Sequence, residues 1–395
     1  MARIGIFGGS FNPPHNGHIE AARQCVERLA LDRLIFVPDA APPHKELAAG
    51  SPTAQQRYEM VRLAAWDVPH AEVSDLELQR SGKSYTVDTL RQFQAQYPTD
   101  ELLLLMGTDM FLSFEGWREP DEIARMAQLV CMHRREAGAA LRRELAEQTQ
   151  RLTALGARVV MAENDALELS STTVRRMLVF DCAERYLPPE VLTYIKTNAL
   201  YGVAEQRRDL PFDALRTQSL RLHDEKRVPH AIGTSNLAAE LAERYGADAA
   251  LCARAGILHD VTKALRAPEQ LALCGHFQVA LTPEERENPK LLHAITGAAV
   301  AREVFGECGE VVRAIRWHTT GRADMSVMEK ILYIADYAEP TRDFPGVERL
   351  RAALARSLDE AVLLGLSMTM EQLRLKGQTV CRDSRAAYDF LRKKG

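Results

Sequence analysis

The sequence predicts two domains of different class, a doubly wound α/β domain with a parallel sheet and then an all-α helical domain. The chain has 395 residues, and domains usually contain about 100–200 residues, so two are expected. Short apolar runs alternate with helical stretches in the first half, whereas helical spacing continues alone in the second. The predicted bounds are 1–203 for the first domain, 204–209 for a linker and 210–395 for the second.

Five short apolar runs in the first half predict buried strands. These runs are Arg3–Phe7, Leu34–Val37, Leu102–Met106, Leu129–Met132 and Arg158–Met161. The stretches between them predict helices, the clearest being Ala54–Trp66, Thr86–Tyr97 and Ala139–Leu155. Strands separated by helices imply a parallel sheet, and such sheets bind ligands at the carboxyl ends of their strands.

The pattern changes after Tyr201-Gly202. The segment 204–211 (AEQRRDLP) is polar and ends in proline, which is typical of a linker. Five later stretches show helical spacing of apolar residues with almost no strand signal. They are Ser235–Tyr245, Ala249–Lys263, Lys290–Phe305, Cys308–His318 and Val327–Ala338. The second domain is therefore expected to be a helical bundle.

Composition indicates an ordinary globular protein, with 46% hydrophobic residues, 26% charged residues and a formal net charge of −4. This balance predicts neither a nucleic-acid partner nor a membrane partner, and it leaves the oligomeric state open. The seven cysteines are scattered and form no CxxC pair, so we expect reduced, mostly buried thiols in a cytoplasmic protein. The start of the sequence, MARIGIFGGSF, enters a strand pattern without a secretory signal.

The segment from Gly8 to His18 reads GGSFNPPHNGH and follows the first predicted strand directly. Its two glycines allow backbone amides to approach a phosphate, and a helix beginning near Asn16 would direct its N-terminal amides there. His15 and His18 are three residues apart and therefore share one helical face. Two imidazoles over a phosphate suit transfer at the α-phosphorus of ATP. A strand and turn with two incidental histidines is the alternative, but the combined motif favours a phosphate site.

This segment resembles G-G-[ST]-F-[DN]-P-x-H-x-G-H, the signature of the nucleotidyltransferase superfamily. Residues 1 to about 202 are most similar to bacterial nicotinate-nucleotide adenylyltransferases. The resemblance implies a Rossmann-like fold and adenylyl transfer from ATP, accompanied by Mg²⁺, to nicotinate mononucleotide, giving deamido-NAD and pyrophosphate. It implies that His15 and His18 stabilise the transition state, and that the loop residues Gly8, Gly9, Ser10 and Phe11 bind substrate. Another mononucleotide acceptor would be compatible with the same fold.

Two further segments resemble phosphate-binding motifs of this family. Pro42-Pro43-His44-Lys45 resembles P-x-H-K, in which Lys45 would meet phosphate, although a solvated loop lysine is the alternative. The segment 170–175 (SSTTVR) resembles I-S-S-T-x-x-R, with Leu169 in place of the isoleucine. The hydroxyls of Ser171 and Thr172 at a helix start, with Arg175 one turn later, would bind ATP phosphates, and a simple helix cap is the alternative.

Acceptor binding is assigned by weaker motifs. The segment 84–90 (SYTVDTL) resembles the family's SYTxDTL and includes Thr86. Gly107 and Asp109, followed by Trp117, resemble a G-x-D…W segment that holds the nicotinate ring and ribose, partly by stacking. Arg134 lies near the family's R-P-G arginine, although the proline and glycine are absent.

The second half contains a different pattern of polar residues in apolar helices. His259-Asp260 ends one helical run, His230 lies upstream, and Asp336 lies in the apolar stretch 331–338 (ILYIADYA). An aspartate there is costly to bury unless it is paired or metal-bound. Nitrogen and oxygen ligands of this kind suit Fe, Mn or a similar divalent ion, and no cysteine joins them, which argues against a structural zinc site.

Two more histidines, His293 and His318, could extend this cluster to two metal ions with Asp260 as a bridge. His223 and His276 are not accompanied by other metal-ligand candidates and are expected at the surface or in loops.

This half, from about Leu210 onward, resembles the HD-superfamily phosphohydrolases, and most closely the symmetrical bis(5′-nucleosyl)-tetraphosphatases. The matching segments are 227–230 (RVPH), 255–263 (AGILHDVTK), 292–294 (LHA), 318–321 (HTTG) and 335–342 (ADYAEPTR). The resemblance implies hydrolysis of diadenosine tetraphosphate to two ADP. By this resemblance the residues that hold a metal are His230, His259, Asp260 and Asp336.

The same resemblance assigns the remaining polar residues. His293 and His318 would hold a second metal or contact phosphate, while Lys263, Arg227 and Arg342 would neutralise substrate phosphates, with Lys263 at the reacting centre. Hydrolysis of another phosphoanhydride, or a purely nucleotide-sensing role for this half, are the alternatives. The presence of all six metal-ligand candidates argues against a pure sensor.

Overall fold

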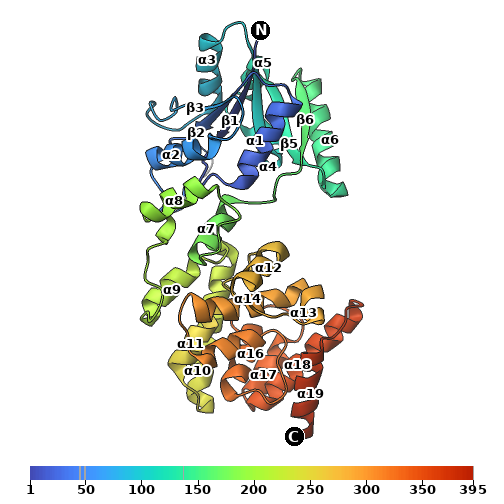
Figure 1. Cartoon of the computed structure of the whole chain (residues 1–395). Coiled ribbons are helices and arrows are strands. Elements are labelled where there is room, and N and C mark those ends of the chain that lie inside the picture. The colour runs from blue at the N-terminus through green and yellow to red at the C-terminus, as the bar shows by residue number, and fades with distance from the viewer. Residues whose placement is uncertain (44–45, 49, 137, 395) are drawn as a thin grey trace. The chain divides into compact units, whose positions relative to one another are not determined.

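The computed structural model describes residues 1–43, 46–48, 50–136 and 138–394 (Figure 1). Its contacts divide the chain into two compact units, Met1–Ala204 and Glu205–Gly395. In the part of the chain that is described, no helix combines the length and the apolar character needed to cross a membrane.

Unit 1 contains a six-stranded parallel sheet with the order β3-β2-β1-β4-β5-β6. The strands are β1 (Arg3–Gly9), β2 (Arg33–Pro38), β3 (Ala71–Val73), β4 (Glu101–Gly107), β5 (Gln128–Arg134) and β6 (Val159–Asn164). The five strands predicted from apolar runs are present, and the doubly wound α/β class is confirmed. The short edge strand β3 was not predicted, because its three residues form no apolar run.

In the described residues of unit 1, eight α-helices accompany the strands. They are α1 (Asn16–Arg28), α2 (Ala54–Ala65), α3 (Thr86–Gln96), α4 (Thr108–Leu112), α5 (Pro120–Met126), α6 (Ala139–Ala154), α7 (Ser171–Val179) and α8 (Pro189–Thr197). Buried side chains of α3, α4, α5 and α6 form one core with one face of the sheet. Helices α1 and α2 contact β2, and right-handed crossovers place them on the opposite face.

The chain leaves the centre of the sheet in opposite directions at β1 and β4. From β1 it winds outward through β2 to β3, and it then returns to β4 and winds through β5 to β6. Ligands of doubly wound sheets bind at such a switch point, outside the carboxyl ends of the strands. Here those ends are Gly8-Gly9 of β1 and Gly107 of β4.

The described residues of unit 2 form helices joined by turns and loops, with no strand, so the predicted all-α class is confirmed. Its α-helices are α9 (Phe212–Leu220), α10 (Val228–Tyr245), α11 (Ala249–Leu258), α12 (Ala267–His276), α13 (Pro283–Glu287), α14 (Pro289–Glu303), α15 (Gly309–Trp317), α16 (Val327–Ala338), α17 (Val347–Leu354), α18 (Leu358–Leu375) and α19 (Arg382–Lys394). Helix α11 packs against α10, α15 and α16, and α14 packs against α15. The metal-ligand candidates lie on or beside these five helices.

Candidate active sites

A cavity of about 760 Å³ opens at the carboxyl ends of β1 and β4. Its volume lies within the range of about 300–1,000 Å³ that is usual for small-molecule sites. The predicted site residues that line it are Gly8, Gly9, Ser10, Phe11, His15, His18, Thr86, Gly107, Asp109, Trp117, Arg134 and Ser171. One cavity therefore brings together predicted residues from five separate parts of the sequence.

The two histidines of the HNGH segment stack at the start of α1. Their ring centroids lie 3.6 Å apart with an interplanar angle of 17°. The backbone amide of His18 donates to Nδ1 of His15 and the backbone amide of His15 donates to Nδ1 of His18, both at 3.3 Å. Each Nδ1 is thus an acceptor, so each neutral ring carries its hydrogen on Nε2. Burial lowers the pKa of His18 to about 4 and that of His15 well below its usual value, so both rings are neutral near pH 7.

Gly17, between these histidines, is required by close packing. A Cβ atom at this position would lie 2.9 Å from the carbonyl oxygen of Leu167 and 3.1 Å from Nδ1 of His15. The segment before α7 therefore passes directly over the start of α1.

Arg57 of α2, which sequence reasoning missed, supports the glycine loop through hydrogen bonds. Its side chain is 0% exposed. The guanidinium donates to the Ser10 carbonyl at 2.7 Å, to Oδ1 of Asp39 at 3.0 Å, and to the carbonyls of Asp39 and Ala40 at 2.7 and 3.2 Å. Burial raises the pKa of Asp39, while the Arg57 charge opposes that rise. A fully buried arginine is rare unless it is paired, but its partners lie far apart in the sequence, so no motif marks it.

The SSTTVR segment is only partly at the cavity. The Ser171 hydroxyl donates to the Pro13 carbonyl at 2.9 Å and lines the cavity. Thr172 and Arg175 are not among the lining residues, and Arg175 instead donates to the Asn12 carbonyl at 2.6 Å and to the Thr172 hydroxyl at 3.0 Å. In this structure the arginine therefore supports the loop. Lys45 lies outside the described residues.

The residues expected to bind the acceptor line the same cavity. Thr86 begins α3 and is one of the lining residues, so the positive end of this helix dipole lies at the cavity. Trp117 packs on Phe114, with ring centroids 5.5 Å apart. Arg134 pairs with Glu168 at 2.7 Å.

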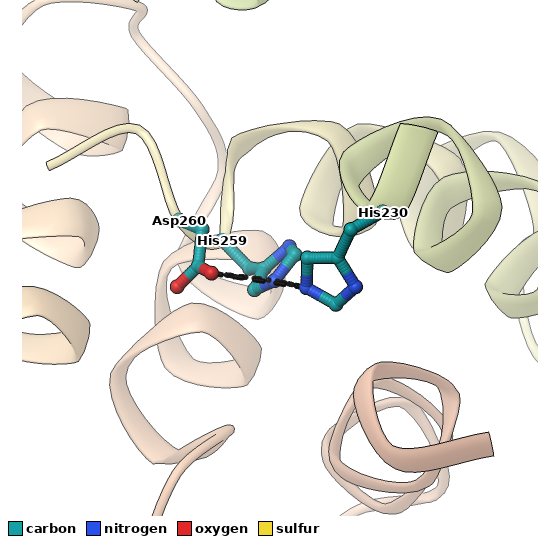
Figure 2. Close-up of side chains that lie close together, drawn as sticks. All are labelled: His230, His259 and Asp260. Atoms are coloured by element: carbon teal, nitrogen blue, oxygen red, sulfur yellow. Dashed lines mark hydrogen bonds and ion pairs between the residues drawn. The ribbon is translucent and has the colours of Figure 1, made fainter. Parts of the chain in front are cut away.

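The second site is a buried cluster around Asp260, and Figure 2 shows His230, His259 and Asp260 converging. Oδ2 of Asp260 lies 3.4 Å from Nε2 of His259 and 3.8 Å from Nε2 of His230. Oδ1 lies 3.4 Å from Nε2 of His293 and 3.7 Å from Nε2 of His318. One carboxylate thus has a histidine pair at each oxygen, and the structure brings all the predicted histidines together.

Asp336 completes the first of these groups. Its Oδ1 lies 3.1 Å from Nε2 of His230 and 3.8 Å from Nε2 of His259. Metal–nitrogen bonds are about 2.1 Å long, so donors on one ion lie roughly 3.0–3.4 Å apart. The cluster has nearly these separations.

The outer nitrogens of the histidines are held so that Nε2 points inward. Nδ1 of His259 donates to the Gly256 carbonyl and Nδ1 of His318 to the Ile315 carbonyl, both at 2.7 Å. Nε2 of each ring therefore carries a lone pair rather than a hydrogen. Nε2 of His230 lies only 3.3 Å from Nε2 of His259, and the His293–His318 pair has the same spacing. In the His230–His259 pair both facing nitrogens are acceptors, because Nδ1 of His230 donates to Glu339, and a cation between them would satisfy both.

The Asp260 carboxylate also indicates that the cluster binds a cation. Its Oδ1 is buried and has no hydrogen-bond partner among the described residues. Burial would raise the pKa of this carboxyl, but the neighbouring His259, His318 and Lys263 side chains hold it well below its usual range. A buried, ionised carboxylate with an orphan oxygen and inward-facing imidazoles fits one or two divalent cations.

Three predicted phosphate-binding cations border the cluster. Arg227 pairs with Oδ2 of Asp260, and Arg342 pairs with Oδ1 of Asp336. Nζ of Lys263 lies 2.9 Å from Nε2 of His293. All three reach the cluster from its rim, and the two arginine side chains are 31% and 33% exposed.

Sequence reasoning missed three polar residues at this cluster. The Thr319 hydroxyl lies 3.2 Å from Nε2 of His293 and 3.1 Å from Nε2 of His318. Glu339 is 0% exposed and binds Nδ1 of His230. Both lie inside matching segments, but their partners become evident only in the folded chain.

The third missed residue is His223, which was expected at the surface or in a loop. It lies in a loop but is only 7% exposed. It lies near His259 of the cluster, and burial first and then this neighbour lower its pKa to about 4. It is buried because its loop packs against the end of α11, where it bonds the backbone of Ile257. His276 is exposed, as expected, although it ends a helix.

Comparison with known proteins supports each half separately. Residues 6–177 match a family model described as cytidylyltransferase-like, and residues 227–341 match the HD domain model. A protein of Geotalea daltonii, named as a probable nicotinate-nucleotide adenylyltransferase, is 39% identical over 213 residues, which cover 51% of this chain and 98% of the relative. The first half of the chain belongs to the nicotinate-nucleotide adenylyltransferase family. A second family member, from Shouchella clausii, is 43% identical over 139 residues, 35% of this chain and 72% of that relative.

The adenylyltransferase half is thus followed by an HD domain. One similar solved structure, from Clostridium acetobutylicum, is described as a predicted HD superfamily hydrolase involved in NAD metabolism. It is 34% identical, has a TM-score of 0.46, and covers 47% of this chain and 99% of that one.

Proposed function

We propose that the first half transfers the adenylyl group of ATP to nicotinate mononucleotide. The proposal rests chiefly on the stacked histidine pair beside the glycine loop, in a cavity large enough for nucleotide substrates. Membership in the adenylyltransferase family supports the choice of substrates.

The reaction needs little covalent chemistry from the protein. A 5′-phosphate oxygen of nicotinate mononucleotide attacks the α-phosphorus of ATP, the bond from that phosphorus to the bridging oxygen breaks, and pyrophosphate leaves with its electron pair. The Nε2 hydrogens of His15 and His18 would donate to phosphate oxygens, where negative charge increases in the transition state. Amides of the Gly8-Gly9 loop and of the α1 start would bind the same oxygens. Mg²⁺ enters with ATP.

For the second half we propose metal-dependent hydrolysis of diadenosine tetraphosphate. The main support for this proposal is that each carboxylate oxygen of Asp260 faces one of two histidine pairs. Iron or a similar divalent ion held by the His and Asp side chains would act as a Lewis acid on the phosphoanhydride.

The surrounding residues would position the substrate. Arg227, Arg342 and Lys263 would exchange their present partners for phosphate oxygens and so orient the polyphosphate. Water adds to an inner phosphorus, and the central phosphoanhydride bond breaks, which converts the substrate and one water into two ADP.

Reciprocal variants of the full chain test both assignments. His18→Ala should lower dinucleotide synthesis by roughly 10²–10³-fold, the usual loss of an electrostatic stabiliser, and leave hydrolysis unchanged. Asp260→Asn should abolish bound metal and hydrolysis and leave dinucleotide synthesis unchanged. Chromatography of the products and elemental analysis of bound metal are the measurements.

The product pattern separates the alternatives for the HD domain. ADP alone supports symmetrical cleavage, whereas ATP plus AMP would keep the metal site and overturn the cleavage assignment. Turnover of a different phosphoanhydride would replace the substrate. Nucleotide binding without any turnover would instead assign a sensing role.

A further inference from the structure

We infer that the two metal positions of the HD cluster differ in affinity and that Glu339 sets the difference. This inference rests on the metal-dependent function proposed above. Position 1 is defined by His230, His259, Asp336 and Oδ2 of Asp260. Position 2 is defined by His293, His318 and Oδ1 of Asp260. Position 1 binds its ion first and more tightly.

Position 1 should bind its ion more tightly because more carboxylates surround it. Its Nε2 atoms lie within 3.1–3.8 Å of oxygens from both Asp260 and Asp336. The nitrogens of position 2 have only Oδ1 of Asp260, whose carboxylate is shared with position 1 through Oδ2. An added anionic ligand strengthens the binding of a divalent cation, particularly in a buried site of low dielectric.

Glu339 adds a third carboxylate behind position 1. Its Oε1 lies 3.0 Å from Nδ1 of His230, whose other nitrogen faces Asp336. The carboxylate is itself fixed, because the Thr341 hydroxyl donates to Oε1 at 2.5 Å and the Thr341 amide donates to Oε2 at 2.7 Å. A carboxylate behind a metal-bound imidazole orients the ring and raises its basicity. The corresponding nitrogens of His259 and His318 meet only carbonyls.

Gly233 shows how closely Glu339 is packed. This glycine lies within α10, where it has no need of a left-handed backbone, and glycine in a helix costs about 1 kcal/mol relative to alanine. A Cβ atom at Gly233 would lie 2.3 Å from Oε2 of Glu339. The side chain of Glu339 therefore requires a residue without a Cβ at this point of the helix.

At position 2 the residue next to a ligand histidine is a cation, Lys263, whereas at position 1 it is the carboxylate Glu339. Nζ of Lys263 lies 3.3 Å from Nδ1 and 2.9 Å from Nε2 of His293. A positive charge at this ring lowers its affinity for a second cation. Position 1 also has cationic neighbours. Arg227 contacts Asp260, and Arg342 contacts Asp336 and lies 3.5 Å from Nε2 of His230, but both leave Nδ1 of His230 to Glu339.

Titration of the metal-stripped full chain with Mn²⁺ tests the inference, with free Mn²⁺ measured by electron paramagnetic resonance and bound Mn²⁺ by calorimetry. The wild type should bind two ions in two resolved steps. Glu339→Gln keeps the shape of the side chain but loses its charge, so it should weaken the tighter step by roughly 10–100-fold and bring the two steps together. Lys263→Met should strengthen the weaker step and leave the tighter one unchanged.

Two glycine variants provide a matched pair. Gly233→Ala should displace Glu339 and weaken the tighter step as Glu339→Gln does. Gly275→Ala, at a helical glycine with nothing within 4 Å of the added atom, should leave both steps as in the wild type.

Two equal steps in the wild type, or equal weakening of both steps by Glu339→Gln, would overturn the inference and leave the metal-dependent function standing. Absence of any Mn²⁺ binding would overturn both. Because Glu339→Gln preserves the packing around Gly233, a folding failure confined to Gly233→Ala leaves the titration of Glu339→Gln to decide.

Discussion

Replacing the buried Arg57 by methionine should destabilise unit 1 and loosen the glycine loop together. The guanidinium makes four hydrogen bonds, including an ion pair with Asp39 at 3.0 Å, and is fully buried. Methionine would leave the Asp39 carboxylate and three carbonyls without this donor. Removing one partner of a buried ion pair costs about 3–5 kcal/mol, so we expect the free energy of unfolding to fall by that amount.

Hydrogen-exchange mass spectrometry in increasing urea can follow peptides of residues 1–204 separately from the rest of the chain. Arg62→Met is the matched control, because Arg62 lies on the same helix and pairs only with Glu59 at the surface. The Arg57 variant should unfold unit 1 at clearly lower urea and reduce dinucleotide synthesis, because Ser10 of the loop loses its support. If both variants unfold at the urea concentration of the wild type, the argument from the buried guanidinium is wrong.

Two further predictions concern pH and domain independence. Burial lowers the pKa of His18 to about 4 from an ordinary value of 6.5. As the pH falls, the imidazole of the unfolded chain therefore takes up its proton before that of the folded chain. The stability that the neutral ring contributes is complete above pH 6.5 and is lost as the pH falls towards 4. The difference in unfolding free energy between wild type and His18→Asn should shrink over this window, and a ring titrating near 6.5 by NMR would contradict it. A protease site inserted between residues 204 and 209 should yield two soluble pieces that keep their separate activities, and an inactive or aggregated piece would refute the proposed boundary.

Local patterns made the fold class and most site residues predictable. The apolar runs of β1, β2, β4 and β5 are continuous because these strands are buried, and the glycine and histidine motifs lie at the end of β1 as expected. The run at 158–161 was also expected to be buried, but β6 is an edge strand and Met161 is exposed. The HD pair ends its helix at His259, where the backbone leaves α11.

The residues that escaped prediction act through partners distant in the sequence. Arg57 supports a loop that precedes it, Glu339 holds His230 from a different helix end, and His223 is buried by the end of α11. Each has an ordinary sequence context, and only the folded chain shows its role. Arg175 shows the opposite case, since its motif indicates phosphate binding while its side chain contacts the Asn12 carbonyl.

The packing at Gly17 has a consequence for protein engineering. The loop that contacts this glycine comes from residue 167, just before the last long helices of the domain. A graft of GGSFNPPHNGH onto the first strand of another parallel sheet would therefore lack the segment that covers the start of the helix in this domain. The smallest transferable unit is the strand end, the start of the helix and the crossing segment, which must be moved as one piece.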